Sequence, residues 1–126
     1  LIKRGQLEES LRRAQHGLVQ AQRLGDAELL ETAQNNLGFA LLESSRFPEA
    51  EAQLEAVLAS RRARLGLGAH DTLGTLGTLA SLHYHQGRYD RGVELLREGL
   101  EAARARLGHG HPMTLMLANN LGTLLN

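Results

Sequence analysis

The chain has 126 residues, the length of one domain of ordinary size. Its fourteen basic and fourteen acidic residues cancel, which argues against a nucleic-acid binder and against a protein that binds anionic membrane surfaces. Cysteine is absent, so disulfide bonds, thiolate metal sites and a cysteine nucleophile are excluded.

The composition also favours a helical, cytoplasmic protein. No stretch approaches the roughly 20 apolar residues that a membrane-spanning helix needs, and the first ten residues contain no apolar segment of signal-peptide length. Aromatic residues are scarce, so a core has to be built from Leu, Ala and Val. Such a core suits closely packed helices better than strands, which favour aromatic and β-branched residues.

Apolar and small residues recur at the 3.6-residue spacing of amphipathic helices along most of the chain. Pro48 and Pro112 stand at first helical positions, where the missing N–H group costs nothing. No segment gives a clear strand signal. In chain order, we predict helices near residues 5–24, 27–44, 48–65, 72–86, 90–107 and 112–126.

The sequence repeats itself with a period of 42 residues. The segment RARLG at residues 62–66 recurs at 104–108, and the segment NNLG at 35–38 recurs two periods later, at 119–122. Gly68 likewise falls on Gly110. Identical matches at one period and at its double indicate an array of structural repeats, each containing two helices.

Glycines are expected to affect this array in two opposite ways. Gly92 and Gly99 lie inside a predicted helix, where glycine costs roughly 0.5–1 kcal/mol relative to alanine. We expect that repeat to be the softer one, unless close backbone packing recovers the loss. Small residues also recur in the first helix of each pair and allow close approach to a partner helix: Gly38, Ala80 and Gly122.

These features resemble the tetratricopeptide repeat, through Leu79-Ala80, Gly87-Arg88-Tyr89 and the small residue Gly92. The period and the joint RLGHGHPMT at 106–114 are similar to the long repeats of kinesin light chains, whose joints typically read Leu-Gly-x-x-His-Pro-x-Thr. The joint RLGLGAHDT at 64–72 departs from that pattern, because Ala69 and His70 replace His-Pro.

The resemblance implies an all-α fold, a right-handed α-solenoid of antiparallel helix pairs. Residues 1–126 would form a single array. Its parts would be the second helix of a partial repeat at 5–24, full repeats at 27–68 and 69–110, and the first helix of a truncated repeat at 111–126.

Histidines are the candidate metal ligands, and we interpret them otherwise. His109 and His111 supply two ligands where a stable site needs three or four, so we predict a helix joint and no metal. His83 and His85 point apart on a helix and cannot clamp one ion. His83 stands where its sister copies have leucine, so we expect it in the core, with His85 facing the groove or solvent.

No pattern of catalytic residues is present. Ser-His-Asp, paired-carboxylate and phosphate-loop arrangements are missing, so we expect neither an enzyme nor a cofactor. An arginine cluster after residue 60 could meet phosphate, but we expect it to cap a helix end and to be balanced by glutamates of the same helix. These residues are Arg61, Arg62, Arg64, Glu49, Glu51 and Glu55.

The resemblance also implies a binding surface. In tetratricopeptide arrays the first helices line a concave groove, and the residue before the Leu-Gly pair faces into it. An asparagine there carries both a donor and an acceptor and can hold the backbone of an extended peptide. A solvated polar face is the alternative. The predicted peptide-binding residues are Asn35, Asn36, Phe39, Glu43, Thr78, Ser81, Tyr84, His85, Asn119, Asn120 and Thr123.

We therefore predict a non-catalytic protein–protein interaction module that binds a peptide segment or a partner domain in the groove. The alternative is a structural, oligomerisation or regulatory spacer within a larger signalling protein. The last predicted helix carries leucines that would pack on a further helix, which indicates a longer array or self-association through this helix. These leucines are Leu115, Leu121, Leu124 and Leu125.

Overall fold

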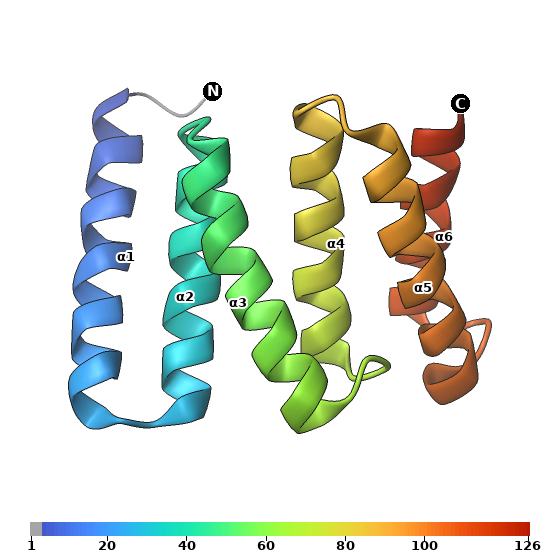
Figure 1. Ribbon diagram of the computed structural model, residues 1–126, viewed down its shortest axis with the longest axis horizontal. Helices are drawn as coiled ribbons and strands as arrows, with labels where there is room; N and C mark the ends of the chain where they lie inside the picture. The colour runs from blue at the N-terminus through green and yellow to red at the C-terminus, as the bar shows by residue number, and fades with distance from the viewer. Residues whose placement is uncertain (1–3) are drawn as a thin grey trace. The chain divides into compact units, whose positions relative to one another are not determined.

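The computed structural model describes residues 4–126, and these residues form six α-helices and no strand. Each predicted helix is confirmed, with ends within two residues of the prediction. No helix in the described part of the chain is long and apolar enough to cross a membrane. The helices are α1 (Arg4–Leu24), α2 (Ala27–Glu43), α3 (Phe47–Leu65), α4 (His70–His85), α5 (Tyr89–Leu107) and α6 (Pro112–Leu125) (Figure 1).

The chain divides into two compact units, Leu1–Val57 and Leu58–Asn126, and α3 crosses the boundary between them. The first unit contains α1, α2 and the beginning of α3. The second contains the end of α3 with α4, α5 and α6. The assignment of residues 1–126 to a single array stays a prediction.

In the first unit, α1 packs against α2. Helix α2 begins where an Asp26 carboxylate oxygen accepts a hydrogen bond from the Leu29 backbone N–H at 3.1 Å, a standard N-cap. Leu37 and Leu41 are buried on α2, and Leu54 is buried on α3. A Cβ built on Gly38 would lie 2.8 Å from Leu54 Cδ2, so the two helices touch through the glycine.

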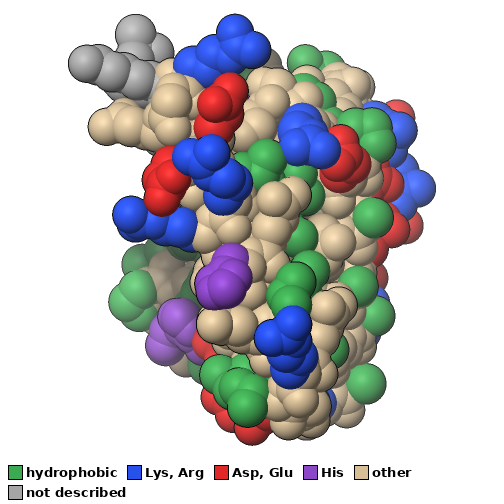
Figure 2. All heavy atoms as spheres, turned by 90° about the vertical axis from the view of Figure 1, so that its left-hand side faces the viewer, with side chains coloured by type: hydrophobic (Ala, Val, Ile, Leu, Met, Phe, Trp, Pro, Cys, Tyr) green, Lys and Arg blue, Asp and Glu red, His purple; other side chains and the backbone are tan. Residues whose placement is uncertain are grey.

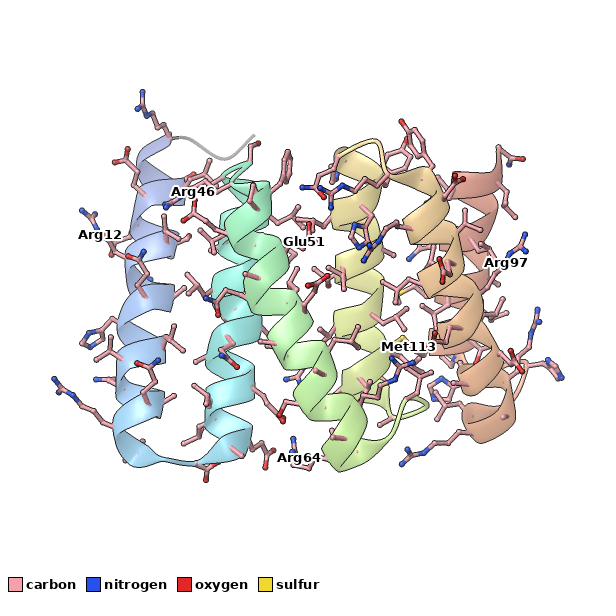
Figure 3. The ribbon with its side chains drawn as sticks, viewed as in Figure 1. Arg12, Arg46, Glu51, Arg64, Arg97 and Met113 are labelled. Atoms are coloured by element: carbon pink, nitrogen blue, oxygen red, sulfur yellow. The ribbon has the colours of Figure 1, made fainter. Side chains whose placement is uncertain are left out.

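The outer face of α1 is charged and solvated. Glu9 accepts hydrogen bonds from Arg12 at 2.7 Å and from Arg13 at 3.0 Å, and these contacts hold the pKa of the Glu9 carboxyl below its usual value. Arg12 points away from α2 (Figure 3). Figure 2 shows acidic and basic side chains side by side on this face. Because the pairs are exposed, they contribute little to stability.

In the second unit, α4 packs against α5 and α6, and α5 packs against α6. Helix α4 supplies the largest share of the core, and α5 adds Leu96, Leu100 and Ala103. His83 is 1% exposed, which confirms its predicted place in the core. Its sister residue Leu41 is buried in the first unit in the same way.

The glycines of α5 are covered closely. A Cβ built on Gly99 would lie 2.7 Å from Leu76 Cδ2, and one built on Gly92 would lie 2.6 Å from Leu124 Cδ2. The packing that could recover their helix-propensity cost is therefore present. Leu124 was predicted to pack on a further helix, but it packs on Gly92 of α5. Gly122 differs from its sister Gly38, because nothing in the described residues lies within 4 Å of a Cβ built there.

Arginines at the end of α3 connect this helix to the helices that follow it. Arg61 Nη1 donates to the Asp71 carbonyl oxygen at 3.3 Å and to Thr75 Oγ1 at 2.8 Å, both in α4. Arg62 forms an ion pair with Glu98 of α5. Arg61 and Arg62 therefore contact helices other than their own, which the sequence did not predict.

The predicted counter-charge Glu49 also has another partner. It pairs with Arg46, at 2.5 Å between Arg46 Nη2 and Glu49 Oε2. The hydrogen bonds that Arg46 donates to the Glu49 carboxylate raise the pKa of the Arg46 guanidinium. This pair lies at the start of α3, away from the arginines at its end.

Two glycines one period apart give a test of this packing. A Cβ at Gly68 would lie 2.9 Å from Arg106 Cβ and 3.0 Å from the Ala102 carbonyl oxygen, whereas one at Gly110 would meet nothing within 4 Å. We expect Gly68→Ala to lower the free energy of unfolding by about 1–3 kcal/mol through overpacking. Gly110→Ala should leave it unchanged or raise it by up to ~1 kcal/mol. Urea denaturation measures both, and equal effects would contradict the close approach of α5 to this joint.

Candidate functional site

The joint between α5 and α6 uses one of its histidines as a helix cap. His111 Nδ1 accepts a hydrogen bond from the Met113 backbone N–H at 3.0 Å, and Pro112 begins α6. The joint is braced by Thr114, whose Oγ1 donates to the Gly108 carbonyl oxygen at 2.8 Å. Residues 4–126 contain no group of three His, Cys, Asp or Glu side chains that could hold a metal ion.

The first unit has a surface hollow between α1 and α2, of about 420 Å³. Helix α2 contributes five of its lining residues and α1 contributes three. A second hollow of about 260 Å³ lies between the same helices, and Asn36 lines both. The larger hollow is lined by Ser10, Arg13, Ala14, Asn35, Asn36, Phe39, Ala40 and Glu43.

Four predicted binding residues therefore meet at the first hollow. Asn36 and Glu43 are exposed, Asn35 is half-buried, and the Phe39 side chain is 50% exposed although it is strongly apolar. The hollow carries one charge of each sign, from Glu43 and from Arg13, and Arg13 is already hydrogen-bonded to Glu9.

The second unit has a smaller hollow between α4 and α6, of about 150 Å³. Four predicted binding residues lie there: Ser81 and Tyr84 on α4, and Asn120 and Thr123 on α6. None of its lining residues carries a formal charge. They are Gly77, Ala80, Ser81, Tyr84, Leu96, Asn120, Thr123 and Leu124.

Three predicted residues line none of these hollows: Thr78, His85 and Asn119. The Thr78 hydroxyl donates to the Gly74 carbonyl oxygen at 3.1 Å, within its own helix. His85 is exposed, as expected, and makes an edge contact with the Tyr84 ring at 5.8 Å between centroids. Asn119 is exposed, but it lies one position before Asn120 on α6 and does not line the hollow.

The residues that the sequence reasoning missed have small or apolar side chains. Gly77, Leu96 and Leu124 form much of the second hollow, yet none of them has a polar group that marks a binding site. One signal was available, because Gly77 stands where the sister helices have Asn35 and Asn119. In the first unit, the contribution of α1 was not foreseen, because the prediction considered only first helices.

Each hollow combines a partly apolar surface with amide and hydroxyl groups at its edge. Such a combination can seat an apolar side chain and hydrogen-bond the backbone that carries it. The two hollows between α1 and α2 belong to the first unit, and the hollow between α4 and α6 belongs to the second. That the first helices of all the repeats line one continuous groove stays a prediction.

Comparisons with known proteins agree with the helix pairs. Two family models, both described as tetratricopeptide repeat, match residues 31–71 and 71–126. No curated protein matches the sequence.

Solved structures share the fold. A kinesin-light-chain-like protein of Podosopora anserina, described as having nearly identical TPR-like repeats, aligns with a TM-score of 0.84 at 22% identity, over 95% of this chain and 58% of its own. A variant of that protein gives 0.83 at 22% identity, over 95% and 57%. BtubC (BKLC) from P. vanneervenii gives 0.69 at 16% identity, over 94% and 65%. The chain thus spans less than two thirds of each of these proteins, and such identities show the fold alone.

The cap at His111 can be tested against its sister position, Ala69, which begins α4 without a side-chain cap. We expect His111→Ala to lower the free energy of unfolding by about 0.5–2 kcal/mol, while His111→Asn, which keeps an acceptor, should cost less. Amide hydrogen exchange at Met113 should accelerate in the alanine variant. Unchanged exchange there would show that the imidazole does not cap α6.

Proposed function

The chain belongs to the tetratricopeptide repeat family, and from that premise we propose that it holds a peptide segment of a partner protein on the first helices of its repeats. Repeats of this family are protein–protein interaction modules. The proposed function is non-catalytic: the partner is bound and released unchanged, without a cofactor.

One observation carries the proposal. Asn36 and Asn120 lie two periods apart, at the same register of α2 and α6, and each lines a hollow of its own unit. An asparagine amide offers two N–H donors and a carbonyl acceptor, which match the acceptor and donor of a peptide bond. The same group placed at the same register twice supports recognition of a peptide backbone.

The neighbours of these asparagines supply apolar contact area. Phe39 is 50% exposed beside Asn36, and Tyr84 is 40% exposed at the hollow that contains Asn120. Exposed aromatic residues are frequent energetic centres of protein interfaces. Two of the four aromatic residues of the chain therefore lie beside the proposed contacts.

The charges of the hollows disfavour other ligand classes. Arg13 is the one basic residue among the lining residues of the hollows described above, and it is bonded to Glu9. A carboxylate clamp or a phosphate site would need several such groups. The hollows therefore favour a protein partner over a nucleic acid or an acidic peptide terminus.

A second candidate function is self-association through α6. Leu115 and Leu125 are 56% and 55% exposed, and Met116 is 40% exposed on the same helix. Apolar side chains that gather on one exposed helix are typical of an interaction surface.

The peptide proposal is tested by affinity capture from host lysate with the chain and its variants Asn36→Ala and Asn120→Ala. Loss of one hydrogen bond to the peptide should weaken binding of a captured partner roughly threefold to tenfold for each variant. Asn119→Ala is the matched control, since Asn119 is exposed next to Asn120 and lines neither hollow. Circular dichroism verifies equal folding. A partner bound equally by all four proteins would place recognition elsewhere.

Self-association is tested by analytical ultracentrifugation over a range of chain concentrations. If α6 forms the interface, Leu115→Glu should abolish a concentration-dependent dimer, because a carboxylate would be buried in an apolar contact. Val19→Glu is the control, since Val19 is an exposed apolar residue of α1. A monomer at every concentration, or equal effects of both variants, would rule out this interface.

A further inference from the structure

The hollow between α4 and α6 exists because two positions of α4 carry unusually small side chains. Gly77 stands where the sister helices have asparagine, at Asn35 and Asn119. Ser81 stands where α2 has Phe39. Because Gly77 has no side chain and that of Ser81 is short, the space beside the α4 backbone is left open. A Cβ built on Gly77 would meet only Met116 Cε, at 3.6 Å.

The floor of this hollow is apolar and its edge is polar but uncharged. Leu96 is fully buried and Ala80 is 1% exposed, so the hollow rests on the core of the unit. The edge includes Asn120 and Tyr84. The Thr123 hydroxyl also lies there, but it already donates to the Asn119 carbonyl oxygen at 3.1 Å.

The volume of the hollow limits what can enter it. About 150 Å³ is the size of an engineered apolar cavity that accepts benzene. A leucine or phenylalanine side chain is of this scale, whereas an alanine side chain would leave most of the space empty. A charged side chain would lose its hydration without meeting an opposite charge, which is costly.

We propose that this hollow is a specificity pocket that seats one leucine- or phenylalanine-sized side chain of an extended partner peptide, flanked by uncharged residues. This inference rests on the proposed function and names the partner segment that the second unit selects. Asn120 at the edge is placed to hydrogen-bond the peptide backbone beside the inserted side chain. The neutral edge selects against acidic or basic flanking residues, because neither would gain an ion pair there.

The chain contains its own optical reporter for this pocket. It has two tyrosines and no tryptophan. Tyr84 lines the pocket, and Tyr89 makes an edge contact with Tyr84 at 5.4 Å between ring centroids. Tyrosine fluorescence therefore reports on this region alone, and Tyr89→Phe leaves Tyr84 as the single fluorophore.

The experiment titrates the full chain with capped nonapeptides of Gly, Ser and Gln that differ only at the central residue, which is Leu, Phe, Ala or Asp. We expect the Leu and Phe peptides to bind at least about tenfold more tightly than the Ala peptide, since each adds several buried carbon atoms. The Asp peptide should bind no better than the Ala peptide.

Variants that fill the pocket provide the decisive comparison. Gly77→Asn and Ser81→Phe introduce the residues that α2 carries at the same register, and circular dichroism verifies that each variant folds. Both should abolish the preference for Leu over Ala. Gly74→Thr is the matched control: it replaces a glycine of α4 outside the pocket with the residue that α2 has there, Thr32, and should keep the preference.

The outcomes separate this inference from the proposed function. If Asn120→Ala weakens all peptides while Gly77→Asn changes nothing, peptide binding stands and the pocket proposal is wrong. If Gly77→Asn removes the preference for Leu and Asn120→Ala has no effect, the pocket proposal is supported and the proposed hydrogen bond from Asn120 to the peptide is wrong. If no peptide binds, or if Gly77→Asn dissolves a dimer of the chain seen by ultracentrifugation, a partner peptide is not the occupant and the pocket proposal is overturned.

Discussion

Leucine side chains packed directly on glycine are the contacts on which both units depend. Leu54 covers Gly38 in the first unit, and Leu76 covers Gly99 in the second. Glycine inside a helix costs roughly 0.5–1 kcal/mol relative to alanine, whereas full burial of a leucine side chain contributes about 1.5–3 kcal/mol. Leucine burial outweighs the glycine cost, so residues that weaken a single helix strengthen the pair. A lone helix of this kind would gain nothing from its glycines.

The two joints lie one period apart in the sequence, but different contacts stabilise them. In the joint after α3, Arg106 Nη1 donates to the Leu65 carbonyl oxygen at 2.8 Å, and the Arg106 stem packs over Gly68. The matching Gly110 is open, and the joint that contains it is held instead by the cap of His111. One joint is thus fixed by a neighbouring helix and the other by its own side chains. His111, predicted to belong to a helix joint and not to a metal site, is the residue that caps α6 there.

Much of the fold was predictable because helix spacing and the 42-residue period reinforce each other. The register alone placed His83 in the core, since its sister residue is Leu41. The residues that line the hollows were harder to predict. Thr78 has the right register, but its hydroxyl bonds to its own helix. The hollow of the second unit was not predicted because Gly77, which leaves space for it, has no side chain that could mark a site. Sequence reasoning that searches for polar groups finds the edge of such a site and misses the space inside it.

The repeats differ at the surfaces where they would meet a partner. At one register, α2 presents Phe39 and α4 presents Ser81, so an aromatic contact in one helix corresponds to open space in the other. The hollow of the first unit includes Glu43, while that of the second is uncharged. Core positions differ between repeats as well, but they stay buried: His83 of α4 corresponds to Leu41 of α2, and both side chains are in the core. In the proposed function, the array gains specificity because each first helix offers a different surface to a different segment of the partner.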